Sequence, residues 1–446
     1  MVTKEEKRRQ MLETPVEKLV CRMAVPTVLT MLITAFYNMA DTYFVGRLDT
    51  VSTAAVGLAL PLMNIIQALG FFFGHGSGNY ISGKLGAGDT RAADIMGDTA
   101  AVLSLISGTV IAAAGLVFIK PLTLMLGATP LLTDKSMEYI SLLLTGVPFM
   151  MASFTMNNQL RFQGSAFLGM MGMGAGSVLN VILDPIFIYT LDMGVRGAAL
   201  ATVLSQVVSF VILLKMSGRL PLRKPMFLLS GDIFLSILKF GTPSLLRQGI
   251  MSAAAVCLNH AAGDFGEAVI AAVSVVNRVI MLGGSAVIGL GQGFQPVCGF
   301  GSGAGRFDRV KKAYLFCIRL STVFIALFGA VVYAFAPGVI AFFRDDPQVI
   351  AAGIPMLRCQ CITGILQGMI IMTNMILQNM GKTLHASILA TARQGLFFIP
   401  LLFLLTSSFG LTGLSVTQSA ADILTAAVTA PMMILVLKEL DRKIGE

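Results

Sequence analysis

Charged residues are scarce in this chain of 446 residues. They make up 12% of it, about half the share found in soluble proteins, whereas apolar residues make up 55%. Apolar runs recur along the whole sequence, and each is long enough for the roughly 20 residues of a membrane-spanning helix. The composition excludes an ordinary soluble protein and predicts an all-α integral membrane protein.

Patterns typical of catalytic or metal sites are missing. The six cysteines lie in or beside apolar runs without C-x-x-C spacing, so we expect small buried side chains. Three scattered histidines, His75, His260 and His385, indicate no metal cluster. The glycines from Gly299 to Gly305 follow an apolar helix rather than a strand, which excludes a phosphate-binding loop. With no nucleophile–base constellation either, we predict a protein that is not an enzyme and needs no cofactor.

The start of the sequence is charged and lacks the short apolar core of a signal peptide, so we expect none. Thr14, Pro15 and Glu17 have the spacing of a capping box with proline at the first helical position. The first membrane helix should therefore begin near Pro15.

The apolar runs predict twelve transmembrane helices in two six-helix lobes. The N-lobe, residues 15–216, has spans at 19–46, 52–82, 93–119, 136–160, 168–190 and 197–216. A polar linker, 217–232, leads to the C-lobe, residues 233–437, with spans at 233–260, 268–298, 313–336, 350–378, 387–408 and 412–437. Spans longer than a bilayer requires imply tilt, kinks or protruding ends.

The two lobes repeat one another. GAGDTRAA begins at Gly86 and GAGRFDRV begins at Gly303, an offset of 217 (303 minus 86). The same offset relates five further pairs: Arg22 and Lys239, Pro26 and Pro243, Pro130 and Pro347, Asn157 and Asn374, and Gly164 and Gly381. Because each copy has an even number of spans, both insert the same way up. This parallel internal repeat predicts a transporter whose substrate path lies between the lobes.

Lysine and arginine favour one side of these spans. With a cytoplasmic N-terminus, most of them lie inside, and few lie outside: Arg47, Lys120, Lys135, Arg196 and Arg344. The positive-inside rule therefore predicts a plasma-membrane protein with both termini in the cytoplasm. The net charge of +9 reflects this topology rather than a nucleic-acid partner.

Two carboxylates fall within predicted spans at similar depth. Asp41 lies in the first span, and Asp184 lies in the fifth, four residues after Asn180 and hence on the same helical face. Thr202 in the sixth span reaches that level, and Pro185 frees a backbone carbonyl one turn back. These oxygens suit Na⁺, and the carboxylates could instead carry a proton. The alternative is that Asp41 only ties neighbouring helices together, although intramembrane carboxylates are functional by default.

The C-lobe does not repeat this acid pair, because the positions at the repeat offset from Asp41 and Asp184 are Leu258 and Leu401. It carries mostly basic residues within its spans, with one acid, Asp422 in the last span: Arg247, Arg278, Arg358 and Arg393. These arginines either line a cavity, snorkel to an interface or form ion pairs between helices. We expect most methionines to fill the core. Gly172 and Gly176 form a G-x-x-x-G motif, which is typical of close packing between membrane helices.

With these features the sequence resembles the multidrug and toxic compound extrusion (MATE) transporters, in particular their DinF-like branch. The resemblance covers residues 15–437 and is carried by NMADTYFVGRL in the first span, GKLGAGDTRAA after the second, NVILDPIF in the fifth and MILQNMGKT after the tenth.

The resemblance implies antiport of lipophilic organic cations against H⁺ or Na⁺. With the parallel repeat, we expect the lobes to rock, in a monomer surrounded by membrane lipids. It implies an N-lobe cation site at Asp41, Asp184, Asn180 and Thr202, and hinges at Pro26 and Pro185. Candidates for the substrate cavity are Tyr37, Asn38, Asn157, Met173, Arg278 and Arg358. Another branch uses acids in the seventh and tenth spans; this chain has none there, which makes a C-lobe ion site doubtful.

Three alternatives remain. A flippase for lipid-linked oligosaccharides, from the same broader superfamily, would place the C-lobe arginines in the cavity. A major-facilitator porter would carry a charged Asp-Arg loop signature, which GKLGAGDTRAA matches poorly. A membrane enzyme would turn over candidate lipids.

An Asp41→Asn substitution tests the antiport hypothesis. We expect it to abolish drug resistance in cells without preventing folding, because a neutral amide cannot alternate between ion-bound and free states. Expression is checked on the purified membrane fraction. Normal resistance from a well-expressed variant would contradict the hypothesis.

Overall fold

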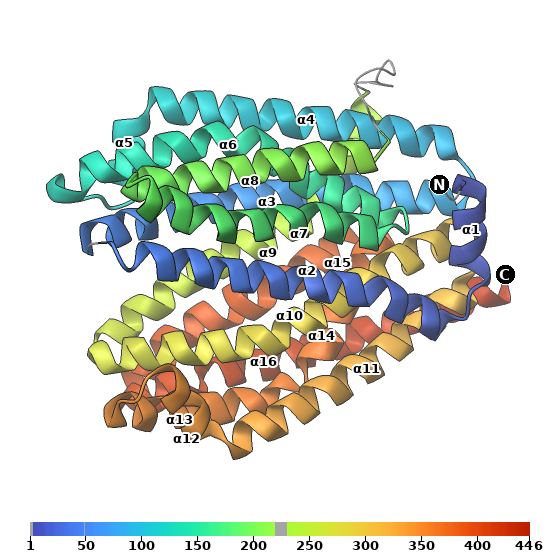
Figure 1. The fold of residues 1–446 in the computed structure, drawn as a ribbon. Helices are drawn as coiled ribbons and strands as arrows, with labels where there is room; N and C mark the ends of the chain where they lie inside the picture. The colour runs from blue at the N-terminus through green and yellow to red at the C-terminus, as the bar shows by residue number, and fades with distance from the viewer. Residues whose placement is uncertain (1–2, 49, 219–229) are drawn as a thin grey trace. The chain divides into compact units, whose positions relative to one another are not determined.

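The computed structural model describes residues 3–48, 50–218 and 230–446, apart from the side chains of residues 4, 35, 37–43, 50, 51 and 131. All regular structure in these ranges is helical (Figure 1), which confirms the predicted all-α class. The chain forms two compact units. Unit 1 comprises Met1–Arg8 and Leu29–Leu245, and unit 2 comprises Arg9–Val28 and Leu246–Glu446.

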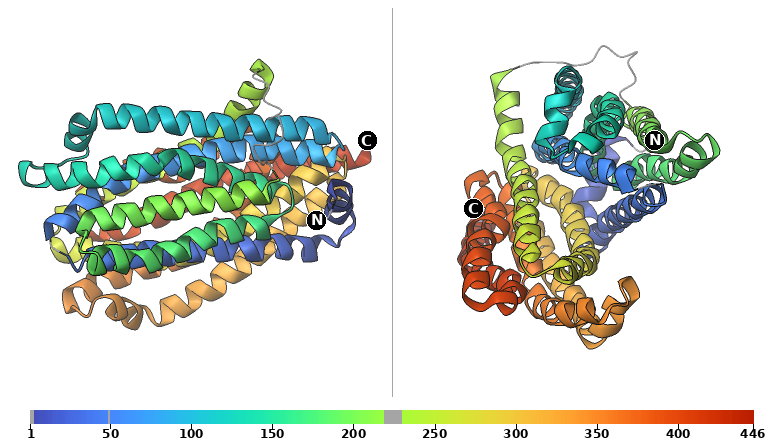
Figure 2. Two further views of the ribbon diagram at one scale, coloured as in Figure 1. Left: turned by 45° about the horizontal axis from the view of Figure 1, so that its top comes forward. Right: turned by 90° about the vertical axis from the view of Figure 1, so that its left-hand side faces the viewer.

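The helices of unit 1 include five of the predicted N-lobe spans, half of the first span and half of the seventh. They are α1 (Lys4–Glu13, partly), the second half of α2 (Val16–Val45), α3 (Thr50–Gly86), α4 (Thr90–Val117), α5 (Ile119–Met125), α6 (Pro130–Phe162), α7 (Ala166–Pro185), the π-helix η1 (Ile186–Thr190), α8 (Gly194–Met216) and the first half of α9 (Gly231–Gly263). Within this unit, α6 packs against α3, α4, α7 and α8. Figure 2 shows these long helices running side by side.

Unit 2 holds the remaining helices. They are the first half of α2, the second half of α9, α10 (Glu267–Gly303), α11 (Phe307–Ala334), α12 (Ala336–Phe343), α13 (Pro347–Gly364), α14 (Gln367–Asn379), α15 (Thr383–Thr391), the π-helix η2 (Ala392–Phe398) and α16 (Ile399–Gly445). The boundaries between the units thus fall within α2 and α9, whereas the sequence predicts lobes that meet at the linker 217–232. Most of that linker, 219–229, lies outside the described residues.

Eight helices of the described chain are long and apolar enough to cross a membrane, or nine if a bent pair counts as one span. The longest such stretch, Thr383–Gly445, contains the non-helical Gly410 (φ 57°), so it folds back on itself and supplies the last two predicted spans. Only a residue without a side chain adopts this backbone conformation easily. The predicted helix start near Pro15 agrees with α2, which begins at Val16.

The tenth predicted span, 350–378, is present but bent. It is divided into α13 and α14, which meet at a bend of 53°. Gly364 ends α13, and the Thr363 hydroxyl donates to the Cys359 carbonyl at 3.3 Å, competing with the helical hydrogen bond at that turn. Apolar periodicity cannot show such a bend, because both halves remain apolar.

The internal repeat is visible in the backbone. Gly88 and Gly305 both have positive φ angles, 88° and 71°, and Gly164 and Gly381 have 75° and 74°. Each pair keeps the offset of the sequence repeat and lies just after the ends of equivalent helices. The short helices α5 and α12 are also equivalent, since Ile119 and Ala336 are related by the same offset. Neither short helix was predicted from the sequence, because both continue the apolar runs of the preceding spans.

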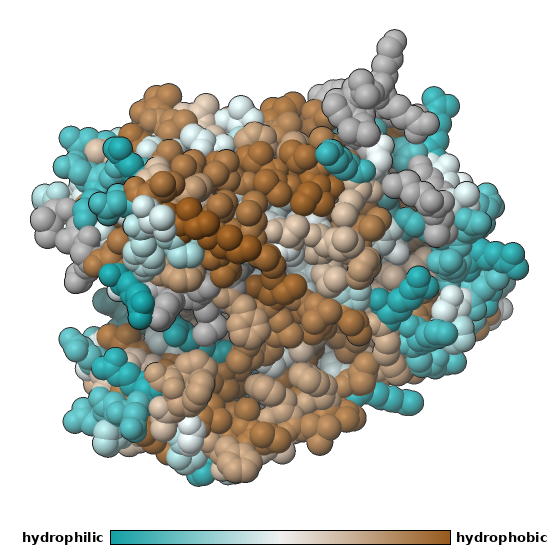
Figure 3. Space-filling view, in the orientation of Figure 1, coloured by the Kyte–Doolittle hydropathy of each residue, from teal (hydrophilic) through white to brown (hydrophobic). Residues whose placement is uncertain are grey.

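Apolar side chains cover the middle of the helices in each unit, and polar ones gather at their ends (Figure 3). Large apolar residues such as Val110, Phe118, Val256 and Leu327 are exposed. In water such surface would be unfavourable, whereas lipid tails solvate it, and helices satisfy their backbone polar groups internally. The buried polar side chains described next are therefore exceptions that need an explanation.

Candidate functional site

The predicted cation site in unit 1 is built mainly on α7 and α8. Asp184 is fully buried (0% exposed), and Asn180 lies one turn before it. The Asn180 Nδ2 donates both to Asp184 Oδ1 and to Thr202 Oγ1 on α8, at 3.4 Å each. The structure thus brings together three of the four predicted site residues. The side chain of the fourth, Asp41 on α2, lies outside the described part of the chain.

Pro185 shapes the backbone beside this carboxylate. It is the last residue of α7, and the chain continues directly as the π-helix η1. Proline has no N–H, so the regular α-helical hydrogen-bond ladder is interrupted immediately after Asp184. π-Helical turns of this kind often occur at functional sites, because they loosen backbone carbonyls and reorient side chains.

A small cavity of about 20 Å³, room for a water-sized group, adjoins Asn180. Its lining consists of Thr34, Phe154, Met173, Gly176, Ser177, Asn180, Thr202, Ser205, Gln206 and Ser209. Three buried oxygens around it accept or donate no hydrogen bond within the described structure: Asn180 Oδ1, Ser205 Oγ and Gln206 Oε1. Buried polar atoms without hydrogen-bond partners are energetically costly. These oxygens could instead bind Na⁺ or a protonated water molecule.

Three residues of this lining were not predicted from the sequence: Ser205, Gln206 and Ser209. Together with Thr202 they recur every three or four residues, which places them on one face of α8. A polar stripe on an otherwise apolar span could have indicated this lining. What the sequence could not show is that this face meets α7.

The candidate substrate residues are dispersed. Met173 lines the unit 1 cavity, whereas Asn157 packs against Gly169 of α7. Arg278 is exposed, and Arg358 lies over the Tyr333 ring, 5.0 Å from its centroid. The side chains of Tyr37 and Asn38 lie outside the described residues. The proposed hinge Pro26 is buried inside the continuous helix α2.

Unit 1 also buries a polar cluster around Arg161 that was not predicted from the sequence. Arg161 Nη2 lies 2.9 Å from His75 Nε2, and His75 Nδ1 lies 2.9 Å from Ser244 Oγ. Because a guanidinium can only donate, His75 Nε2 must accept, which leaves Nδ1 as the donor to serine in a neutral imidazole. Arg161 is thus buried at the end of α6 and links α3, α6 and α9.

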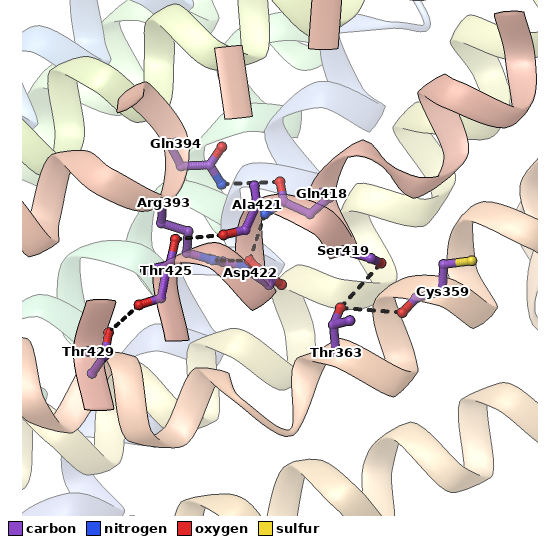
Figure 4. A network of polar contacts seen from close by, with 10 residues as sticks. All are labelled: Cys359, Thr363, Arg393, Gln394, Gln418, Ser419, Ala421, Asp422, Thr425 and Thr429. Atoms are coloured by element: carbon purple, nitrogen blue, oxygen red, sulfur yellow. Dashed lines mark hydrogen bonds and ion pairs between the residues drawn. The ribbon is translucent and has the colours of Figure 1, made fainter. Parts of the chain in front are cut away.

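Unit 2 contains a second polar network, between η2 and α16 (Figure 4). Arg393 pairs with Asp422 through Nε and Oδ1 at 2.7 Å and through Nη2 and Oδ2 at 3.4 Å. Gln418 Nε2 donates to the same Oδ1 at 2.9 Å. Of the roles that the sequence left open for Arg393, the structure supports an ion pair between helices.

Among the described residues there is no group of three histidine, cysteine or acidic side chains that could hold a metal.

Comparison with known families decides the class of the protein. The model of the MatE family matches residues 26–186 and 243–404, once in each repeat. This chain belongs to the MatE family. The double match also confirms the duplication inferred from the sequence.

Relatives of this MatE protein are similar over nearly their whole length. The multidrug export protein MepA of Staphylococcus aureus (strain MRSA252) is 28% identical over 438 residues, covering 96% of this chain and 95% of MepA. A crystal structure of MATE in complex with MaL6 superposes with a TM-score of 0.91 at 29% identity, covering 98% of this chain and 99% of that one. An outward-facing multidrug resistance MATE family transporter of the MOP superfamily gives 0.90 at 30% identity, covering 98% of both chains. The chain is therefore a multi-pass membrane transporter of a multidrug efflux family.

Proposed function

We propose that this MatE protein exports lipophilic organic cations from the cytoplasm in exchange for H⁺ or Na⁺. The observation that carries the proposal is Asp184, a fully buried carboxylate hydrogen-bonded to Asn180 beside a cavity with unsatisfied oxygens. A carboxylate in this setting is stabilised either by a proton or by a small cation. Asp41, the second acid predicted for this site from the sequence, would complete it.

Coupling follows from linkage between the ion and the conformation. An ion can drive transport only if it binds one conformation more tightly than the other. In the outward-facing state, H⁺ or Na⁺ enters the site at Asp184 and changes the packing of α7 against its neighbours, which weakens the hold on a bound organic cation. The lobes then rock inward, release the ion and accept new substrate. The protein acts as a monomer in the plasma membrane with both termini in the cytoplasm.

The flippase alternative needs arginines available for phosphate-bearing substrates. Arg393 is engaged by Asp422 and Arg358 is stacked on Tyr333, whereas Arg278 is exposed. The relatives that the chain matches are multidrug export proteins rather than flippases. We therefore do not propose it as the function.

Ethidium efflux from proteoliposomes tests the proposal. We expect efflux under an imposed Na⁺ gradient or an imposed pH gradient, measured separately by loss of ethidium fluorescence on DNA trapped inside the vesicles. Vesicles with collapsed gradients are the control. Efflux with one gradient only identifies the coupling ion. Protein that is folded by size-exclusion chromatography and exports nothing under either gradient would contradict the proposal.

A further inference from the structure

Two carboxylates are fully buried in the described chain, one in each unit: Asp184 and Asp422. Asp184 accepts from the neutral Asn180, whereas Asp422, 1% exposed, is paired with the Arg393 guanidinium, which is 24% exposed. Gln418 completes the contacts of Asp422, and Arg393 is the one charged partner that it has among the described residues.

The internal repeat shows what replaces this pair in the other copy. At the repeat offset, Arg393 corresponds to Gly176 and Asp422 to Ser205, which face each other on α7 and α8. A Cβ atom on Gly176 would come within 2.8 Å of the Ser205 carbonyl oxygen, so unit 1 has no space for a side chain there. Unit 2 fits an arginine at the equivalent position, and it does so where η2 begins, at Ala392. The wider π-helical turn shifts the backbone relative to an α-helix and makes room for the pair.

We propose that Arg393 is a built-in cation at the unit 2 counterpart of the Gly176–Ser205 wall of the cavity beside the coupling site, so that Asp422 binds no H⁺ or Na⁺ while Arg393 is present. A guanidinium keeps its proton at any physiological pH, and its planar fork matches a carboxylate. Because it is attached to the same protein, it competes with free ions at a high effective concentration. This inference deepens the proposed function, on which it rests, by confining ion coupling to unit 1.

A small cation would have access to Asp422 if the guanidinium were removed. Gln418, which contacts Asp422, also lines a cavity of about 20 Å³ in unit 2, enough for a water-sized group. The same cavity is lined by Asn277 and Gln360. These carboxamide oxygens could help to bind a small cation beside the carboxylate. If the Arg393–Asp422 ion pair were only structural, removing the guanidinium would create no new cation binding.

The test counts bound cations in variants of the full-length purified protein. The reference is Asp184→Asn, which removes the proposed unit 1 site. Adding Arg393→Gln, which keeps hydrogen-bond donors but removes the charge, should increase binding by about one equivalent of H⁺ or Na⁺ per protein, because one freed carboxylate takes one monovalent cation. Adding Asp422→Asn as well should remove that gain. Na⁺ is measured by radioactive ²²Na⁺ binding, and H⁺ by proton uptake after a pH jump.

The outcomes separate this inference from the proposed function. If the Asp184→Asn variant binds as many ions as the wild type does, the coupling site of the proposed function is wrong. The effect of Arg393→Gln is then measured by comparing the single Arg393→Gln variant with the wild type. A folded Arg393→Gln variant without any gain would overturn the inference. Asp422→Asn alone provides a test that does not depend on the folding of Arg393→Gln, since the asparagine amide oxygen can still accept a hydrogen bond from Arg393. It should leave the number of bound cations unchanged, and a loss would show that Asp422 already binds an ion beside Arg393.

Discussion

Ethidium efflux driven by either gradient should fall to the level of protein-free vesicles when Asp184 is replaced by asparagine. The amide has nearly the same shape and can still accept a hydrogen bond from Asn180, so we expect the α7–α8 contact to remain. It cannot, however, take up a proton or neutralise Na⁺ at pH 7, and without a difference in ion affinity between the two states the gradient does no work on the substrate.

Asp192→Asn is the matched control for this experiment. Asp192 lies eight residues further along the chain, is exposed, and has a left-handed backbone (φ 51°) that asparagine also adopts readily. This variant should export ethidium at the wild-type rate. Equal efflux from the Asp184→Asn variant would show that the buried carboxylate of unit 1 is not the coupling group.

A Gly176→Val substitution should both destabilise the protein and strongly reduce efflux. Gly176 is buried on α7, and a Cβ there would meet the Ser205 backbone of α8 at 2.8 Å, which a rotamer change cannot relieve. Overpacking of this kind costs about 1–3 kcal/mol. Since close contacts through small residues hold membrane helices together, α8 must shift and carry Thr202 away from Asn180.

Gly174→Val provides the comparison on the same helix. A Cβ at Gly174 would come no nearer than 3.8 Å to another side chain, that of Ile33, so we expect little change. Thermal unfolding in detergent and ethidium efflux would be measured for both variants. Equal stability of the two would mean that α7 and α8 are not packed as closely as the structure indicates.

Several features of the candidate site were predictable from the sequence. Asn180 and Asp184 share a face because they are four residues apart on one helix, and this relation is local. The repeat was equally clear, since duplicated motifs keep their spacing whatever the fold. The long spans followed from apolar runs, although the bend between α13 and α14 did not, because it leaves the apolar pattern unchanged.

The sequence alone therefore determined the class of the protein, its duplicated helices and the acids in its membrane spans, because these depend on composition and on relations within single helices. Only the tertiary structure decided which helix faces meet. It placed Thr202 and Ser205 of α8 beside α7, buried Arg161 against His75 and paired Arg393 with Asp422. Such contacts join residues that are 22 to 86 positions apart, and they depend on how whole helices pack, which no short stretch of sequence specifies.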